Sequence, residues 1–468
     1  GLLLLLYRWD IFIFLLAASL AFFYLASAFF RMVAAISGFF YRYESAGIPE
    51  GELPVYTILL PMYKEANIVE QLIARIRSLD YPQDKLDVKL LLEQDDAETL
   101  ERLKSWNLPS SSFEILVMDP CIPKTKPRAC NYGLERARGE FCVIYDAEDH
   151  PEPDQLKKAV GMFRAAGREN VACVQAKLNY DNSRQNLLTR LFTIEYTTHF
   201  DLILPGMQMF HFPLPLGGTS NHFRTEILRG IGGWDPFNVT EDCDLGIRIY
   251  ENRYRTMLLD STTWEEANSR TGNWIRQRSR WVKGFLQTHL VHYRRWPDTV
   301  RRLGAWAAFG GYLAIGGSSL MLLCNLVFGA LLLFYCTLLA VGVAQGVPLT
   351  EQIIAPNYYP PSAYGVEFLG IYWKAWPLIY FGPDESMFYS TLSIVFAVIS
   401  LLLFLANFIF IAIGALGCIK RRSWHLIVFT PLMIFYWQLM SLAAWKGFFQ
   451  LFYKPFYWEK TKHGLSAK

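Results

Sequence analysis

Two clusters of acidic side chains each follow a short apolar run in this sequence. Residues 93–96 read EQDD and residues 146–149 read DAED. Asp146 and Glu148 are one residue apart, so on an extended chain both carboxylates can reach one cation. Carboxylate oxygens are hard ligands that suit Mg²⁺ or Mn²⁺, and these ions usually also hold substrate phosphates. Either cluster alone could be a solvated turn, but the two together favour a metal or nucleotide site.

A phosphate group bound here needs positive charge from side chains as well as from a metal. The sequence contains neither the GxxxxGK[ST] loop nor the GxGxxG loop that cradle phosphates with backbone amides. The basic candidates are Lys126, Arg128, Arg278 and Arg280. Acidic metal ligands without a glycine-rich loop suit a nucleoside-diphosphate donor.

A third polar group, made of Thr240, Glu241 and Asp242, precedes a stretch with the apolar spacing of a helix. Thr240 could cap that helix while the two acids stabilise its first turn. Alternatively, a carboxylate at the end of a rigid helix is well placed to act as a general base. Both roles stay open at this point.

A basic and aromatic cluster follows further along the chain. It contains Gln277, Arg280 and Trp281, with further cations at Arg278 and Lys283. This cluster could bind phosphate and sugar. It could also be a basic helix that faces a membrane and is anchored there by its tryptophan.

The elements between these groups must position them. Strand-like apolar runs at 55–60, 88–92, 113–117 and 141–145 alternate with helical stretches such as 66–79. Such alternation predicts a mostly parallel α/β sheet. Because ligands of these sheets bind beyond the carboxyl ends of the strands, we expect the first two acidic clusters to lie along one edge.

The composition points to a membrane. The 468 residues include 45 basic and 42 acidic side chains, a net charge of +3, with 52% hydrophobic and only 19% charged residues. A soluble domain usually has about 25% charged residues. The composition therefore excludes a disordered chain and a fully soluble enzyme. The near-neutral balance also argues against a nucleic-acid partner.

Four long uncharged runs account for the low charge: residues 11–30, 305–344, 387–417 and 423–445. About 20 residues suffice to cross the hydrocarbon of a bilayer, so the second run is long enough for two crossings with a break near Asn325. Buried helices of a large soluble core are the alternative, but four such runs in one chain make it a poor one. We expect an integral membrane protein.

The charges around residues 41–296 indicate which side of the membrane they occupy. Arg31 and Arg42 lie near the start of this part, and arginines 294, 295, 301 and 302 lie near its end, so the positive-inside rule places it in the cytoplasm. Four later crossings return the C-terminus to the cytoplasm but leave the basic residues 420–422 outside. Three later crossings would instead place residues 420–422 in the cytoplasm and leave the C-terminus outside.

Taken together, the motifs resemble those of the family 2 glycosyltransferases, in particular the membrane-embedded processive synthases of cellulose, hyaluronan and chitin. Six motifs occur in the family's order. Pro61, Tyr63 and Glu65 match the PxYxE opening, whose residues touch the nucleoside in the family. Glu93 and Asp95 stand where the family's first acid meets the base or ribose.

The resemblance extends to the donor site. Lys126 begins a KPRACN stretch similar to the family's KAGALN-type segment beside the nucleotide. Asp146 and Glu148 occupy the DxD position, which implies donor binding through Mg²⁺ or Mn²⁺. Arg280, from the QxxRW motif, is implied to meet the donor diphosphate.

The transfer site and the acceptor also have counterparts. Thr240, Glu241 and Asp242 form the TED motif, the family's catalytic group, whose final Asp is the base. Gln277 and Trp281, from QxxRW, are implied to bind the acceptor sugar.

Two departures from the family pattern leave alternatives open. Glu148 replaces the usual second Asp and is one methylene longer, so Asp149 could share the ligand role. The first acidic motif is EQDD and not the more usual DDG-type sequence. Glu93, Asp95 or Asp96 could therefore contact the base.

The C-terminal segment 458–462 resembles the family's gating loop, which covers the nucleotide from the cytoplasmic side. The resemblance therefore places Thr461 and Lys462 at the donor. A cytoplasmic tail favours four later crossings over three.

The implied architecture is a cytoplasmic GT-A domain, a Rossmann-like α/β fold, inserted between transmembrane α-helices. We expect an N-terminal helix and juxtamembrane segment at 1–43 and the GT-A domain with interfacial helices at 44–290. Transmembrane helices follow at 291–454, with an interfacial segment at 345–386, and the tail occupies 455–468.

The implied activity is that of a processive inverting glycosyltransferase of the inner membrane. It would polymerise a β-linked polysaccharide from a nucleotide sugar, with a UDP-sugar as the expected donor, and translocate it across the membrane. Its partners would be the donor, the growing polysaccharide, the lipid bilayer and accessory export proteins. A non-processive transferase acting on a membrane lipid is the second interpretation. A transporter with a nucleotide-sensing domain is a remote third.

Overall fold

The computed structural model describes residues 9–44, 47–120, 122–165, 167–346, 387–455 and 457, together with four short strands between residues 354 and 380. These residues fall into two compact units. The smaller lies within Gly1–Phe29 and Leu320–Ile411, and the larger within Phe30–Ser319 and Ala412–Lys468. Every predicted site residue that the structure describes belongs to the larger unit.

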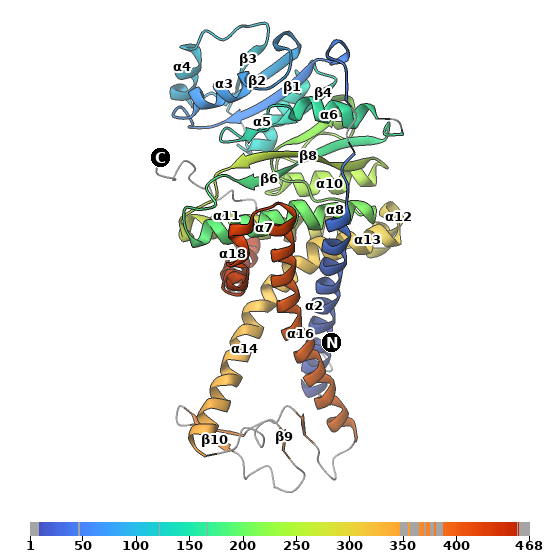
Figure 1. Cartoon of the computed structure of the whole chain (residues 1–468), viewed down its shortest axis with the longest axis vertical. Helices are drawn as coiled ribbons and strands as arrows, with labels where there is room; N and C mark the ends of the chain where they lie inside the picture. Colours follow the sequence, from blue (N-terminus) through green and yellow to red (C-terminus); the bar gives the residue numbers. More distant parts are fainter. Residues whose placement is uncertain are drawn as a thin grey trace. The chain divides into compact units, whose positions relative to one another are not determined.

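An eight-stranded mixed sheet forms the centre of the larger unit, in the order β3-β2-β1-β4-β7-β6-β8-β5 (Figure 1). Its strands are β1 (Tyr56–Met62), β2 (Leu86–Glu93), β3 (Phe113–Met118), β4 (Phe141–Ile144), β5 (His150–Pro151), β6 (Val171–Tyr180), β7 (Asn221–Arg224) and β8 (Arg255–Glu265). Neighbours in the first four positions are parallel, as are β6 and β8. β7 runs antiparallel to both neighbours, and β5 runs antiparallel to β8. The four predicted strands are thus confirmed and are parallel to one another, but the sheet as a whole is mixed.

Helices cover both faces of this sheet because its strands are apolar on both sides. Side chains alternate across a strand, so Ile58 and Leu60 of β1 pack in one core while Leu59 packs in the other. Strands buried on both faces read as continuous apolar runs, which is why the sequence revealed them. The covering helices are α3 (Val69–Arg77), α4 (Ala97–Lys104), α5 (Lys126–Glu135), α6 (Gln155–Arg164) and α10 (Glu241–Glu251).

Further helices lie near β6 and β8 (Figure 1). Of these, α7 (Leu187–Thr198) contacts β6 and α8 (Leu204–Met209) contacts β8. The others, α11 (Thr271–Tyr293), α12 (Trp296–Leu303) and α18 (Met433–Tyr453), pack mainly against helices. α11 and α18 lie side by side and approach closely at Gly447, where a Cβ atom would come within 2.5 Å of the Ser279 carbonyl oxygen. α11 also contacts α10. The helix that carries QxxRW is therefore held from two directions.

The apolar helices correct two expectations. They are α2 (Trp9–Phe40), α13 (Ala305–Gly311), α14 (Ser318–Ala344), α16 (Met387–Lys420) and α17 (Trp424–Ile427). The expected break near Asn325 is wrong, because α14 runs straight through that residue in a stretch without proline. Residues 423–445 do not form one helix, because a 3₁₀ turn at Thr430–Leu432 separates α17 from α18. Pro431 lies in this turn and cannot donate a helical hydrogen bond.

Two helical stretches of the described residues, Ala18–Phe40 and Ala305–Ala330, are long and apolar enough to cross a bilayer. A third, Phe404–Lys420, is shorter. Core helices of soluble proteins can have the same length and composition, so membrane crossing stays a prediction. The expected interfacial segment 345–386 lies for the most part outside the described residues.

Candidate active site

The carboxyl ends of β1, β2 and β4 meet at one edge of the sheet, which brings the second acidic cluster next to α5. There Asp146 forms an ion pair with Lys126, the first residue of α5. The Lys126 ammonium also donates a 2.6 Å hydrogen bond to the carbonyl of Gly218. Burial disfavours this ammonium, but the carboxylates of Asp146 and Glu241 outweigh burial and raise the pKa of Lys126. Lys126 therefore links the DxD position to the TED motif electrostatically.

Asp149 closes the turn that follows β4. One of its oxygens accepts a 2.7 Å hydrogen bond from the backbone N–H of Asp146 and another bond from the Thr219 hydroxyl. Its Oδ1 is buried and has no hydrogen-bond partner among the described residues. Burial, and then the charges of Asp146 and Glu148, raises the pKa of Asp149 well above its usual range. The pKa of Glu265, at the end of β8, is raised by burial and by the same three carboxylates.

These donors fit a divalent cation. They are hard oxygen ligands, they repel one another, and a buried oxygen of Asp149 lacks a partner in the described structure. Within the described residues, no three His, Cys, Asp or Glu side chains are grouped so that they could hold an ion by themselves. An ion bound by Asp146 and Glu148 would therefore take its other ligands from a diphosphate and from water, as Mg²⁺ usually does.

Two of the three acidic residues at the end of β2 form hydrogen bonds with other groups of the protein. The oxygens of Glu93 each accept a 3.3 Å hydrogen bond from Arg128. Asp96 caps α4, because its carboxylate accepts from the backbone N–H of Thr99 at 3.4 Å and from that of Lys64 at 2.6 Å. Both carboxylates therefore hold the loops around the site.

Asp95 is the acid of this cluster that stays exposed. It accepts a 3.1 Å hydrogen bond from the Tyr63 hydroxyl and pairs with Lys124, whose ammonium lies 4.0 Å from the Tyr63 ring centroid. The hydrogen bond from Lys124 lowers the pKa of Asp95. Pro61 lies in β1, and the backbone N–H of Glu65 donates a 3.2 Å bond to α4. The structure thus brings together the PxYxE motif and the first acidic cluster.

The TED motif starts α10 at Glu241. The Thr240 side chain does not cap this helix, so that part of the alternative is wrong, whereas Glu241 and Asp242 do lie in the first turn. Its hydroxyl lies instead 3.4 Å from the hydroxyl of Thr288 on α11, and its backbone N–H donates to Asn238 at 3.0 Å. Thr240 is therefore part of a contact between two helices.

Asp242 has the properties of a general base. Its Oδ1 accepts a 2.7 Å hydrogen bond from the Cys243 backbone N–H. Burial raises the pKa of Asp242 to about 6, although Cys243, Lys126 and Arg280 act in the opposite direction. Burial and the nearby Asp242 charge raise the pKa of Glu241 to about 8. A base is most effective when its pKa lies near the working pH.

Arg278 is buried in a pair with Glu195. Its side chain pairs with the Glu195 carboxylate and donates a 3.0 Å hydrogen bond to the Tyr436 hydroxyl. The Arg278 guanidinium lies 4.5 Å from the ring centroid of Trp281, and the Tyr196 ring stacks near the same tryptophan at 6.2 Å. Trp281 is thus supported by a buried cation and a second ring.

The rest of the cluster is also tied to the protein. The Gln277 side-chain oxygen accepts a 2.8 Å hydrogen bond from Asn268. Lys283 is fully buried and donates to the carbonyls of Lys454 at 3.2 Å and Tyr457 at 2.7 Å. Because Arg278 and Lys283 lie inside the protein, a basic helix that faces a membrane does not fit this cluster.

The predicted donor contacts of Thr461 and Lys462 lie outside the described residues. What the structure does describe is the start of that tail, which Lys283 of α11 holds at the end of α18. The contact of the tail with the donor stays a prediction.

Comparisons with known proteins agree with this geometry. Residues 57–219 match the glycosyl transferase family 2, and residues 141–348 match the glycosyl transferase family group 2. The chain carries a family 2 glycosyltransferase domain. Its sheet, with a parallel half and a mixed half, is the GT-A-like, Rossmann-type fold predicted from the motifs.

Two curated relatives of the glycosyltransferase domain have similar sequences. The probable glycosyltransferase YdaM of Bacillus subtilis is 28% identical over 236 residues, which is 50% of this chain and 56% of the relative. The probable glucomannan 4-beta-mannosyltransferase 7 of Oryza sativa subsp. japonica is 30% identical over 242 residues, which is 50% of this chain and 41% of the relative. The chain thus spans about half the length of the curated relatives it matches.

Solved structures are also similar to the glycosyltransferase domain. The mannosyltransferase PcManGT from Pyrobaculum calidifontis, in complex with GDP-Man and Mn²⁺, has a TM-score of 0.49 and 20% identity over 72% of this chain and 92% of its own. TarS residues 1–349 from S. aureus have a TM-score of 0.38 and 14% identity over 55% of this chain and 71% of their own.

The glycosyltransferase domain also uses residues that no motif indicated. Glu265 ends β8, but the polar residues 260–263 separate it from the apolar residues 257–259, so the pattern that marked the first two acidic clusters does not mark it. Glu195 pairs with Arg278, which is 83 positions away in the chain, and no local sequence pattern around either residue predicts this ion pair.

Proposed function

We propose that this chain is a processive, inverting glycosyltransferase that builds a β-linked polysaccharide from a nucleotide sugar and passes it across a membrane. The observation that carries the proposal is electrostatic. Lys126 pairs with Asp146 and donates a hydrogen bond to the carbonyl of Gly218, where an added Cβ atom would lie 3.4 Å from Oδ2 of Asp242. The charges of Lys126 and Arg280 also act to lower the pKa of Asp242 and of Glu241. Lys126 and Arg280, whose positive charge suits a diphosphate, are therefore close to Asp242, whose carboxylate could activate a hydroxyl. Trp281 lies on the same helix as Arg280, and its ring is packed against Arg278 and Tyr196. Such a ring could stack on the acceptor sugar and hold it.

In the proposed transfer, Asp242 takes the proton of the acceptor hydroxyl as the hydroxyl oxygen attacks the anomeric carbon. The bond from that carbon to the donor diphosphate breaks on the opposite face, and the diphosphate leaves with the electron pair. The anomeric configuration is therefore inverted. Lys126 and Arg280 offset the negative charge that grows on the leaving group.

A divalent ion would be held by Asp146 and Glu148, and when bound it would add positive charge at the leaving diphosphate. Mg²⁺ and Mn²⁺ both suit these oxygen ligands. A UDP-sugar is the expected donor. Because one relative is named a glucomannan mannosyltransferase, a mannosyl donor is the second choice.

We further propose that the domain lies on the cytoplasmic side of the plasma membrane. Two described helical stretches of membrane-crossing length and the arginines that flank the domain support this placement. Extraction of membranes at alkaline pH tests it, because an integral protein stays with the lipid. Recovery of the whole chain in the supernatant would contradict the proposal.

The activity is tested with the purified full chain and a panel of UDP- and GDP-sugars, with Mg²⁺ or Mn²⁺. Released nucleoside diphosphate and product size are measured together, and Asp242→Asn provides the background. We expect one donor to give both diphosphate and a long polymer. One sugar joined to a lipid would support the non-processive alternative. No release above background from any donor would contradict a glycosyltransferase.

A further inference from the structure

One face of α11 docks onto the segment that leads into the TED motif and onto α10. Gly284, Thr288 and His292 follow one another in steps of four, so they lie on the same side of the helix. We call them the docking face of α11. Gly284 is in close contact with Thr240, because a Cβ atom there would lie 2.3 Å from the Thr240 methyl carbon. Thr288 accepts a 3.1 Å hydrogen bond from the Asn238 side chain.

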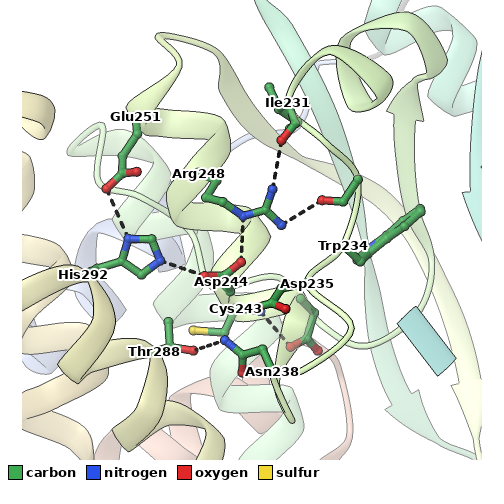
Figure 2. A network of polar contacts seen from close by, with 12 residues as sticks. Ile231, Trp234, Asp235, Asn238, Cys243, Asp244, Arg248, Glu251, Thr288 and His292 are labelled. Atoms are coloured by element: carbon green, nitrogen blue, oxygen red, sulfur yellow. Dashed lines mark hydrogen bonds and ion pairs between the residues drawn. The ribbon is translucent and has the colours of Figure 1, made fainter. Parts of the chain in front are cut away.

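His292 ends the docking face and lies between two carboxylates of α10 (Figure 2). Its Nε2 is 2.8 Å from Oδ1 of Asp244, and its Nδ1 is 3.1 Å from Oε1 of Glu251. A neutral imidazole has one N–H and could donate to only one of them. Burial alone would lower the pKa of His292, but the bonds to both carboxylates raise it to about 9. The geometry and the pKa agree on a doubly donating imidazolium at neutral pH.

Asp244 connects His292 to the loop that precedes the TED motif. The second oxygen of Asp244 accepts a 2.7 Å hydrogen bond from Arg248. Arg248 in turn donates to the carbonyls of Ile231 at 3.1 Å and Gly233 at 2.7 Å, in the loop that leads to the TED motif (Figure 2). Asp244 is buried and His292 is 5% exposed. Loss of either partner would therefore cost substantial free energy, because water cannot readily take its place.

The remaining charged groups around His292 complete a compensated network. On α12, Arg302 lies 3.2 Å from the second partner, Glu251, and its side chain also donates to the His292 backbone carbonyl at 3.3 Å. On α10, burial opposes ionisation of Asp244, yet His292 and Arg248 together lower its pKa. Removal of the imidazolium would leave the buried carboxylate of Asp244 and the partly buried carboxylate of Glu251 facing the gap.

We propose that His292 is a positioning residue that fixes Arg280 relative to Asp242. Arg280 lies on the same helix, about one turn before Gly284, and its charge acts to lower the pKa of Asp242. His292 is twelve residues from Arg280, a distance of about 18 Å along the axis at 1.5 Å per residue. Rotation or sliding of α11 at the His292 end would therefore shift the cation near the carboxylates. Misplacement by about 1 Å can cost about a hundredfold in rate.

This inference rests on the proposed function, since the two positioned groups are the cation and the base of the proposed transfer. It does not depend on the identity of the sugar. It predicts a larger effect on kcat than on donor affinity, because the negative charge that Arg280 offsets grows on the diphosphate as the bond to the sugar breaks.

The test replaces His292 by glutamine in the full chain, which keeps a hydrogen-bonding side chain but removes the charge. The matched control is His289→Gln on the same helix. Burial lowers the pKa of His289 to about 4, so that histidine is neutral through the range studied. A milder variant, Glu251→Gln, keeps His292 and removes one of its two anionic partners.

The first readout is the melting temperature between pH 6 and pH 10. His292 has a raised pKa in the folded chain, so its stabilisation is complete below about 6.5 and is lost as the pH rises through about 9. We expect the difference between the wild-type chain and His292→Gln to shrink over that range, and the difference for His289→Gln to stay constant. Equal pH dependence in both variants would overturn the charged contact.

The second readout is kcat and donor KM at pH 7, followed by the pH–rate profile. For His292→Gln we expect kcat to fall at least about tenfold, with a smaller change in donor KM. For Glu251→Gln we expect near-normal kcat at pH 7 and an alkaline limit about one pH unit lower than in the wild type. Should kcat of His292→Gln match that of His289→Gln, the positioning role is wrong. If the wild-type chain releases no diphosphate from any donor, the proposed function falls and the positioning role with it, while the melting curves still decide whether the charged contact exists.

Discussion

The guanidinium of Arg278 lies 4.5 Å from the ring centroid of Trp281. Glu195 and Tyr436 hold that guanidinium in turn. Trp281 therefore has a fixed position in the described structure, set by contacts of α7, α11 and α18. A rigid aromatic face offers apolar area to a sugar ring without demanding one orientation. Such a surface suits an acceptor that must advance by one unit after each transfer.

From this relationship we predict that Trp281→Ala loses polymer while it keeps donor binding. Polymer yield should fall by at least about tenfold, which corresponds to about 1.4 kcal/mol of acceptor affinity. Trp424→Ala, at an exposed tryptophan, is the control for loss of an indole. The measurement combines polymer yield with nucleotide affinity by calorimetry. Full-length polymer from Trp281→Ala at the wild-type rate would show that the acceptor is held elsewhere.

The second prediction concerns the proposed metal ligands. Asp146→Asn should abolish divalent-dependent nucleotide binding, because an amide cannot balance the charge of a cation. Asp84→Asn, at an exposed position outside the site, should bind nucleotide and metal normally. Nucleotide titrations with Mn²⁺ and with EDTA check this. Wild-type affinity that is identical in EDTA would remove the metal from the account.

The third prediction concerns the proposed base. Asp242→Asn should lower kcat by about a hundredfold or more with little change in donor affinity. Wild-type kcat should fall as the pH drops through about 6, because the protonated carboxyl cannot accept a proton. A variant with normal kcat and weakened donor affinity would make Asp242 a binding residue.

The same residue should carry a cost in stability. The folded pKa of Asp242 is raised, so the ionised form disfavours the folded chain, and stability is lost as the pH rises from about 4 through about 6. Asp242→Asn should therefore melt at a higher temperature than the wild type at pH 7, with a smaller difference at pH 4. Melting curves at the two pH values measure this directly.

The fourth prediction tests the docking of α11. Gly284→Ala would place a Cβ atom 2.3 to 2.8 Å from three side-chain atoms of Thr240. We expect a loss of about 1–3 kcal/mol in the free energy of unfolding and a lower kcat. Gly272→Ala, on the same helix with nothing within 4 Å of the added atom, should leave both unchanged. If the two variants behave alike, α11 tolerates a shift and the contact does not constrain the site.

The sequence predicted the part of the fold that local patterns encode. The strands β1, β2 and β4 are buried almost throughout and each contains an apolar run, while Glu93 ends β2 and Asp146 comes shortly after β4. The antiparallel strand β7 could not be predicted from the sequence, because Asn221–Arg224 is short and its direction depends on partners distant in sequence. The break expected near Asn325 was wrong, because a polar residue alone does not end a helix without proline.

The candidate site shows the same division. Asp146, Asp242 and Trp281 were predicted from motifs, and the structure places each beside charged partners. The pairs that hold them in place could not be predicted. His292 meets Asp244 from 48 positions away, and such contacts arise only when two helices pack. Local patterns thus indicate the reacting groups, and tertiary packing supplies the groups that position them.

Processive polymerisation is the central claim, and product length early in the reaction tests it most directly. The full chain is given a short pulse of isotope-labelled donor with acceptor in excess over enzyme, and the labelled products are separated by size. The account predicts long polymer from the first time point beside unextended acceptor, with no populated intermediates. Products that carry one sugar, or that lengthen together step by step, would contradict it.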